Sequence, residues 1–171
     1  MNNSTMFSSD RIDWNTPKEI IEIIRKFDDI GLDPCSNPNS IVGATTEWSL
    51  EKGISGLRRP WTEHGLVYCN PPYGRAIAEW SRKIVEEAAL GAEVICLLPS
   101  RTDTSWMQLM FRFCNVSLFW KGRLTFLGAP SAAPFPSCIM YFGKRDSRFC
   151  EIFDQFGQLY RRVQTNVGRE E

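Results

Sequence analysis

The sequence lacks several features that would narrow its function at once. It has no net charge, because 20 Lys and Arg balance 20 Asp and Glu among 171 residues, so composition gives no sign of a general nucleic-acid binder. His64 is the only histidine and no Cys-x-x-Cys pair occurs, which argues against a zinc site and predicts no bound metal. The six cysteines lie mostly within apolar runs, and we expect free, buried thiols in a reducing compartment.

The sequence also lacks a long apolar run, and its polar start, "MNNSTMFSSD", does not resemble a signal peptide. We therefore expect a cytoplasmic protein that does not bind membranes. Hydrophobic residues make up 43% and charged residues 23%, as in an ordinary globular protein. We expect a flexible arm over 1–12, one domain over 13–162 and a flexible tail over 163–171.

Apolar periodicity predicts helices alternating with strands along this domain. Helices are expected at 17–27, 75–90 and 104–113, with a last helix that carries Phe149, Ile152, Phe153, Phe156 and Tyr160 on one face. Strands are expected within 29–33, 65–70, 92–100, 115–120 and 137–143. For the first helix, Thr16 is the expected N-cap, Pro17 the first helical residue and Glu19 the partner that completes a capping box.

This alternation predicts a doubly wound α/β sheet with mainly parallel pairing. Because no helix separates the last two expected strands, we expect an antiparallel strand at one edge. Ligands of open α/β sheets bind beyond the carboxyl ends of the strands. That rule points to three segments, 33–39, 70–74 and 100–104.

The most informative segment is "NPPYG", from Asn70 to Gly74, directly after an expected strand. An exocyclic amine on a planar base is a poor nucleophile because its lone pair is delocalised into the ring. The side-chain oxygen of Asn70 and the backbone carbonyl of Pro71 could each accept one of its hydrogens, which would make the lone pair available. The two prolines, Pro71 and Pro72, restrict the backbone and hold both acceptors in place.

Tyr73 offers a ring on which an extruded base could stack, and Gly74 lets the backbone pass close to a ligand. The simpler alternative is a turn that ends a strand, or a proline-rich ligand for a partner domain. WW-type ligands want a spacer between the prolines and the tyrosine, which "PPYG" lacks, so we favour catalysis.

Six motifs in order carry a resemblance to a known family: "WNTP" at Trp14, "LDPCSNP" at Leu32, "NPPYG" at Asn70, "LLPSRTDTSW" at Leu97, "GRLTF" at Gly122 and "APFPS" at Ala133. Together they resemble the phage-type DNA N-6-adenine methyltransferases, the phage Dam family, over about residues 13–142. The resemblance implies a Rossmann-like methyltransferase fold, S-adenosylmethionine as cofactor, double-stranded DNA as substrate and base flipping. It also implies a bacterial or phage-encoded enzyme.

On this resemblance, Asn70, Pro71, Pro72 and Tyr73 would hold the adenine. The residues implied in cofactor binding are Trp14, Thr16, Pro17, Asp33, Pro34, Cys35 and Asn70. Related enzymes carry an LDPxxGxG loop, whereas Asn37 and Asn39 stand here at the glycine positions. Asn tolerates left-handed geometry, so the turn can be retained. Glu47 and Glu51 are both candidates for binding the cofactor ribose.

Arg101, Lys121 and Arg123 are the expected contacts to DNA phosphates, around the rim of the Asn70 pocket. For each functional residue a structural role is the alternative: a helix cap for Thr16, a turn for Asp33, a cap region for Arg101, and a solvated surface for Lys121 and Arg123.

Two alternative functions remain open from the residues. The same chemistry could methylate RNA adenine or a protein glutamine amide, because that amide poses the same electronic problem as the base. A non-catalytic nucleic-acid-binding module with a methyltransferase fold is the third possibility.

Overall fold

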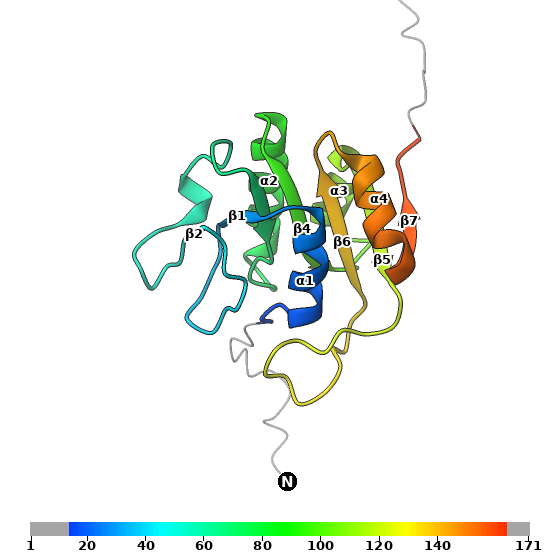
Figure 1. The fold of residues 1–171 in the computed structure, drawn as a ribbon, viewed down its shortest axis with the longest axis horizontal. Helices are drawn as coiled ribbons and strands as arrows, with labels where there is room; N and C mark the ends of the chain where they lie inside the picture. The colour runs from blue at the N-terminus through cyan, green and yellow to red at the C-terminus, as the bar shows by residue number, and fades with distance from the viewer. Residues whose placement is uncertain (1–13, 164–171) are drawn as a thin grey trace, which may run out of the picture.

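Seven strands form one sheet in the order β2-β1-β3-β4-β6-β5-β7 (Figure 1). The structure is a computed structural model that describes residues 14–163. The expected arm over 1–12, and the expected tail apart from Val163, lie outside the described residues. The strands are β1 (Ile30–Asp33), β2 (Thr46–Glu47), β3 (Leu66–Cys69), β4 (Glu93–Pro99), β5 (Val116–Trp120), β6 (Ser137–Phe142) and β7 (Gly157–Tyr160).

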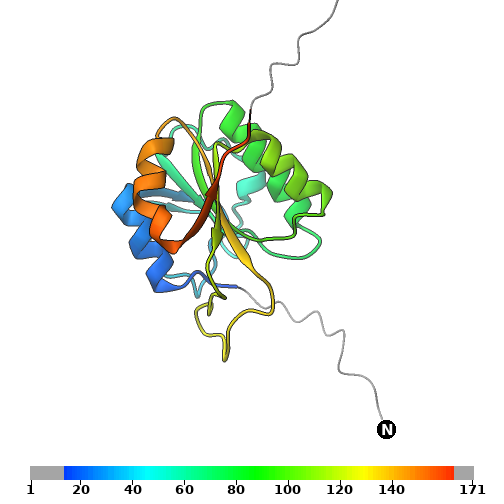
Figure 2. The same ribbon diagram turned by 90° about the vertical axis from the view of Figure 1, so that its right-hand side faces the viewer.

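Four α-helices in the described residues cover the two faces of this sheet, so the expected α/β class is confirmed. They are α1 (Lys18–Phe27), α2 (Ile77–Ala89), α3 (Ser105–Phe113) and α4 (Asp146–Phe153). Figure 2 shows α1 and α4 on one face and α2 and α3 on the other. Ile24 and Phe149 are fully buried on the first face, and Ile84 and Met107 on the second. Within residues 14–163, no helix combines the length and apolar composition needed to cross a membrane.

The expectation of a mainly parallel sheet holds for only half of the pairings. The pairs β1–β2, β1–β3 and β3–β4 are parallel, whereas β4–β6, β5–β6 and β5–β7 are antiparallel. The expected antiparallel edge strand exists, but it is β7, which pairs with β5. The other reversed strand, β6, is an interior strand. All six of its residues are buried, which fits a strand covered by helices on both faces.

The last helix is shorter than predicted. It ends at Phe153, and a single 3-10 turn over Asp154–Phe156 leads into β7, so Tyr160 lies on a strand. Gly157 permits this change because a Cβ there would lie 2.0 Å from the carbonyl oxygen of Phe119. Only glycine lets the chain approach β5 this closely.

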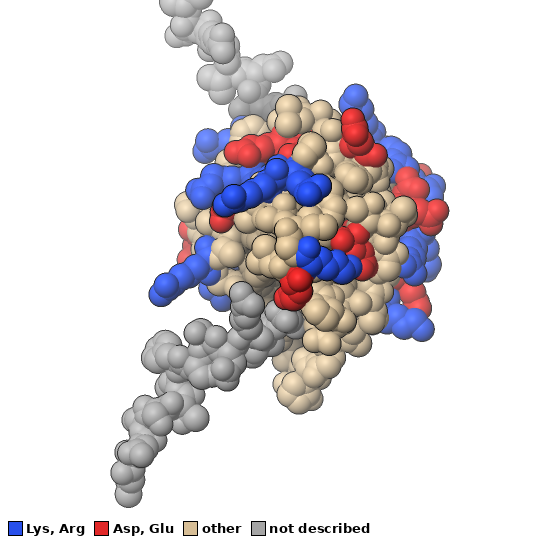
Figure 3. Space-filling view, turned by 90° about the vertical axis from the view of Figure 1, so that its left-hand side faces the viewer, with Lys and Arg blue, Asp and Glu red and all other residues tan. Residues whose placement is uncertain are grey.

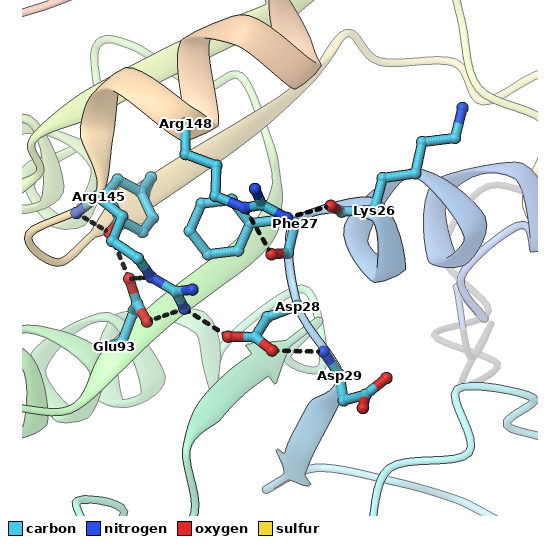
Figure 4. Close-up of polar contacts among 8 residues, drawn as sticks. Lys26, Phe27, Asp28, Asp29, Glu93, Arg145 and Arg148 are labelled. Atoms are coloured by element: carbon cyan, nitrogen blue, oxygen red, sulfur yellow. Dashed lines mark hydrogen bonds and ion pairs between the residues drawn. The ribbon is translucent and has the colours of Figure 1, made fainter.

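An ion-pair network fastens the start of α4 to the start of β4 and to the end of α1, on the same face of the sheet (Figure 4). The Arg145 guanidinium donates to both oxygens of Glu93, at the start of β4, and to Asp28 Oδ2 at 2.7 Å, just after α1. Arg145 also lies 4.5 Å from the Phe27 ring centroid. Its hydrogen bond holds the pKa of Asp28 below the usual value of 3.8. Arg148 adds hydrogen bonds to the backbone carbonyls at the end of α1.

We predict that Arg145→Met lowers the free energy of unfolding by about 1–2 kcal/mol at neutral pH, since both carboxylates lose a charged donor that is partly exposed to solvent. Because the folded-state pKa of Asp28 is depressed, its share of this stability is present above about pH 4 and is lost as the pH falls below that value. Urea unfolding at pH 7 and pH 3 measures the effect. Lys144→Met, at the exposed neighbouring position, is the control; equal losses in both variants would contradict the prediction.

Candidate active site

The three segments expected to lie together do so at one edge of the sheet. Strands β1, β3 and β4 are adjacent and parallel, so the loops after Asp33, Cys69 and Pro99 leave the same edge. In Figure 1 this is the lower edge, where the start of α1 and the loop of residues 121–136 also lie. The prediction from strand polarity therefore places the candidate residues correctly.

The segment Trp14–Pro17 joins the loops at this edge. Asn15 accepts a hydrogen bond from Asn37 Nδ2 at 2.7 Å, and its carbonyl accepts the amide of Leu127 at 2.8 Å. Trp14 accepts from Asn70 Nδ2 at 2.6 Å through its backbone carbonyl. Four consecutive residues thus fasten the loop after β1, the loop after β3 and the loop between β5 and β6.

Thr16 does not cap the helix. Pro17 occupies the N-cap position of α1, and no side chain caps this end, so the capping box predicted for Thr16 and Glu19 is wrong. The Thr16 hydroxyl is instead 2.8 Å from the hydroxyl of Tyr68 and accepts a hydrogen bond from Asn70 Nδ2 at 3.1 Å. Thr16 is only 4% exposed. Its side chain supports Asn70.

Asn70 has one side-chain atom without a partner. Both hydrogens of Nδ2 are donated, to Trp14 and to Thr16, but the buried Oδ1 accepts no hydrogen bond within the described residues. Ser100 and Ser137, at the adjoining ends of β4 and β6, also bury hydroxyl oxygens without partners among those residues. Unpaired buried polar atoms are rare in folded proteins and mark this edge as a place where a polar ligand can bind.

The rest of the NPPY motif follows Asn70 in the loop after β3. Pro71 is buried and Pro72 is exposed, and Gly74 has φ 100°, which favours glycine. Tyr73 donates its hydroxyl to the carbonyl of Leu97 at 3.3 Å. Burial raises the pKa of Tyr73 well above its usual range, so the phenol stays protonated.

Four aromatic rings from distant parts of the chain gather beside Asn70. Trp14 lies 5.2 Å from Phe126 and 5.0 Å from Phe135, both edge-on. Tyr73 meets the same two phenylalanines at 6.2 and 5.7 Å. Sequence reasoning did not single out Phe126 or Phe135, although both lie within the motifs "GRLTF" and "APFPS". Their position near Tyr73 depends on the antiparallel return of β6.

The loop after β1 holds a buried carboxyl group. Asp33 is 4% exposed and accepts the Cys35 amide at 3.1 Å. Burial, together with the nearby charge of Glu47, raises the pKa of Asp33 to about 7. Glu47 ends β2 directly beside Asp33 in the pairing register, whereas Glu51 is exposed in the following turn.

Two more contacts place this loop against its neighbours. The Cys35 thiol donates to the carbonyl of Asn70 at 3.2 Å, so the loops after β1 and β3 touch. Pro34 is packed against Gly56, where a Cβ would lie 2.1 Å from the Pro34 carbonyl oxygen. Sequence reasoning missed Gly56, whose only local signal is the "SGL" turn that contains it.

All six cysteines are free thiols, as expected. Cys69, Cys96 and Cys138 are buried, and Cys35, Cys114 and Cys150 are partly exposed. Among residues 14–163, no three His, Cys, Asp or Glu side chains gather in a way that could hold a metal ion.

The three expected DNA contacts are all exposed, but they lie at different distances from Asn70. Arg101 follows β4 by two residues, and Thr104 caps α3 as the structural alternative proposed. Arg123 is three residues before Phe126, hence within about 11 Å of it along the chain. Lys121 follows β5, whose position three strands from β3 corresponds to roughly 14 Å of sheet width. The side-chain hydrogen bonds of Asn70 go to Trp14 and Thr16 and not to these three residues.

Basic residues also lie at the β2 edge. Arg58 and Arg59 are exposed there, and Arg59 lies 5.8 Å from the ring centroid of Trp48. Figure 3 shows this side of the molecule, with Lys and Arg side chains grouped over its upper part among scattered acidic ones and an uncharged projection below. Two surface cavities, of about 460 and 330 Å³, are lined by none of the candidate site residues.

One known protein family matches most of the chain. A family model described as DNA N-6-adenine-methyltransferase (Dam) matches residues 3–137, well over half of the 171 residues. The matched range contains every loop at the Asn70 edge. A comparison with curated proteins gave no match.

Because Asp33 is buried, we predict that it makes the stability of the protein depend on pH. Its folded-state pKa of about 7 lies above the usual 3.8, so its contribution to stability is fully present below about pH 4 and is lost as the pH rises to about 7. Asp33→Asn keeps the acceptor for the Cys35 amide and removes the charge. We expect the variant to be more stable than the wild type at pH 8, by up to about 4 kcal/mol, and much closer to it at pH 4.

Urea unfolding of the protein without ligands at pH 4 and pH 8 measures this difference. Asp103→Asn is the control, since Asp103 is exposed on the same edge. An Asp33→Asn variant that is less stable than the wild type at pH 8 would show that the Asp33 carboxylate is well satisfied in the folded state.

Proposed function

The chain belongs to the DNA N-6-adenine-methyltransferase (Dam) family, and from this premise we propose that it transfers a methyl group from S-adenosylmethionine to the N6 amine of adenine in DNA. The observation that carries the proposal is the buried Asn70 Oδ1, which accepts no hydrogen bond within residues 14–163. A neutral acceptor in that position suits an amine that must donate a hydrogen. The catalytic residues would be Asn70, Pro71, Pro72 and Tyr73, within one methyltransferase domain over 13–162.

Asn70 and Pro71 would act on the target amine together. Asn70 Oδ1 accepts one hydrogen and the Pro71 carbonyl accepts the other, which draws the nitrogen toward a pyramidal geometry and frees its lone pair. The freed lone pair could then form a bond to the electrophilic methyl group that bound S-adenosylmethionine would supply, with the thioether as leaving group, and the amine would release a proton to solvent. Both acceptors are fixed before the substrate arrives, so little reorganisation is needed during the reaction.

The cofactor fits the polar groups at this edge. When bound, S-adenosylmethionine supplies an electrophilic methyl group on a positively charged sulfur. Asp33 has a raised pKa, and within residues 14–163 its carboxyl group accepts a hydrogen bond from Cys35 alone, so it could receive a further donor such as the ammonium of the methionine end. Trp14, Thr16, Pro17, Pro34, Cys35 and Asn70 complete the proposed cofactor contacts.

Of the two candidates for the ribose, the geometry supports Glu47. It lies beside Asp33 at the carboxyl end of β2, whereas Glu51 lies beyond the strand in an exposed turn. A carboxylate in that position can accept hydrogen bonds from two ribose hydroxyls. We propose Glu47 for this role.

Double-stranded DNA is the proposed substrate, and an adenine must leave the base stack to reach Asn70. Tyr73, in contact with Phe126 and Phe135, would provide a stacking surface worth roughly 1–3 kcal/mol. Such an enzyme acts where bacterial or phage DNA is found, in the cytoplasm. Assays that offer duplex DNA, RNA and a glutamine-containing protein test the substrate class; methyl transfer to RNA or protein alone would refute the DNA proposal.

For the chemical step, we predict that Asn70→Ala reduces methyl transfer to duplex DNA about 100-fold or more, as for the loss of one preorganised contact in comparable sites. Binding of S-adenosylmethionine should change little, because six other residues also carry the proposed cofactor contacts. Transfer of a radioactive methyl group to unmethylated plasmid DNA measures the rate. The matched control is Asn115→Ala, because Asn115 lies at the opposite edge and bonds the Gly143 amide. Near-normal transfer by Asn70→Ala would remove the central role of this residue.

For DNA binding, we predict that Arg123→Glu weakens affinity for all sequences and lowers the slope of log affinity against log salt by about one unit. The reason is that a protein with one phosphate contact fewer releases fewer counterions when it binds DNA. Binding to a duplex oligonucleotide is titrated at several salt concentrations. Arg82→Glu, on the exposed side of α2, changes the net charge equally and is the control. If both variants give the same slope, Arg123 does not contact phosphate, and Arg58 and Arg59 become the next candidates.

A further inference from the structure

A chain of hydrogen bonds leads from the core of the sheet to the side chain of Asn70. Tyr68 and Thr16 hydroxyls are 2.8 Å apart, and Thr16 Oγ1 accepts from Asn70 Nδ2 at 3.1 Å. Tyr68 is fully buried and Thr16 nearly so. The ring of Tyr68 packs in the core, and Thr16 caps no helix. The Thr16 hydroxyl is thus free to bond the Asn70 amide, and the Tyr68 hydroxyl bonds Thr16 from the other side.

These contacts decide which way the Asn70 amide faces. Nδ2 lies 2.6 Å from the carbonyl oxygen of Trp14, and reversing the amide would bring Oδ1 against that oxygen, two acceptors with no hydrogen between them. Thr16 takes the second hydrogen of Nδ2. With both hydrogens held by the protein, Oδ1 has to face the ligand site, where it remains without a partner among the described residues.

The position of Tyr68 follows from the alternating side-chain directions along β3. Residues two apart on a strand point to the same face, so the ring of Tyr68 lies under Asn70, on the face covered by α1. Burial raises the pKa of Tyr68 well above its usual range, so it keeps its hydroxyl hydrogen at neutral pH. Whichever of the two hydroxyls donates, the bond between them fixes the rotation of the Thr16 hydroxyl.

We propose that Tyr68 is a positioning residue for catalysis, which acts through Thr16 to hold the Asn70 amide in its reactive orientation. The inference rests on the proposed function and deepens it. Tyr68 touches neither substrate nor reacting atoms. Its effect should appear in the rate of methyl transfer more than in substrate binding, because the Asn70 contact strengthens as positive charge develops on the amine in the transition state.

The principal variant is Tyr68→Phe, which removes the hydroxyl and keeps the ring. We expect the single-turnover rate of methyl transfer to unmethylated plasmid DNA to fall about tenfold, the equivalent of one neutral hydrogen bond. The Kd for S-adenosylmethionine, measured by calorimetry without DNA, should stay within about twofold of the wild type. The matched control is Tyr141→Phe. Tyr141 is a buried tyrosine of the same sheet whose hydroxyl bonds Glu93 and Arg145 at the opposite edge, so its loss should leave the rate unchanged.

Thr16 variants test whether Tyr68 acts through that residue. Thr16→Val is isosteric and leaves one Asn70 hydrogen unpaired, so its rate should fall at least as far as that of Tyr68→Phe. Thr16→Ser keeps the hydroxyl, so its rate should be close to that of the wild type. The double variant Tyr68→Phe/Thr16→Val should be no slower than Thr16→Val alone, because the relay is already broken.

The outcomes separate this inference from the proposed function. If the wild type transfers no methyl group to DNA, the proposed function fails. If the wild type is active, the inference is overturned by an unchanged rate in Tyr68→Phe, by an equal loss in Tyr141→Phe, by a loss of cofactor affinity that accounts for the slower rate, or by additive losses in the double variant.

Discussion

The four residues Trp14–Pro17 carry the constraint on which the candidate site depends. Their hydrogen bonds reach Asn37, Asn70 and Leu127, which belong to three loops far apart in sequence. Each contact crosses 22 residues or more, so each closes a long loop whose entropy must be offset by packing. The ring of Trp14 supplies that packing against Phe126 and Phe135. The segment thereby reinforces the direct contacts between these loops, such as the one from Cys35 to Asn70.

At the two ends of the strands, charged and polar groups have opposite effects on the stability of the fold. At the far edge, Arg145 meets Glu93 and Asp28, so these three charges have partners and the pairs favour folding. At the candidate site, Asp33 is buried with a raised pKa and Asn70 Oδ1 lacks a partner within residues 14–163. These groups oppose folding of the protein without ligands. Strain of this kind is typical of sites that are complete only when a ligand binds.

The antiparallel half of the sheet contributes to the site as much as the parallel half. The parallel strands β1, β3 and β4 bring the polar groups to one edge, as the rule for α/β sheets predicts. β6 is adjacent and antiparallel to β5, and the long loop 121–136 that joins them carries Phe126 and Phe135 back to Tyr73. Arg123, on the same loop, is thereby carried toward the proposed DNA-facing edge.

The sequence by itself determined the elements whose signals are local. Periodicity placed α1, α2, α3 and five of the strands within a few residues, and the turn-forming NPPYG identified the loop at the carboxyl end of β3. Tertiary structure decided what depends on distant partners. Thr16 lies where the sequence predicts a helix cap, yet its hydroxyl faces that of Tyr68, 52 residues away. Tyr160 continues a helical pattern, yet pairing with Ser117 makes it part of a strand. Local patterns specify how a segment can fold, but only the register of the assembled sheet fixes which side chains meet.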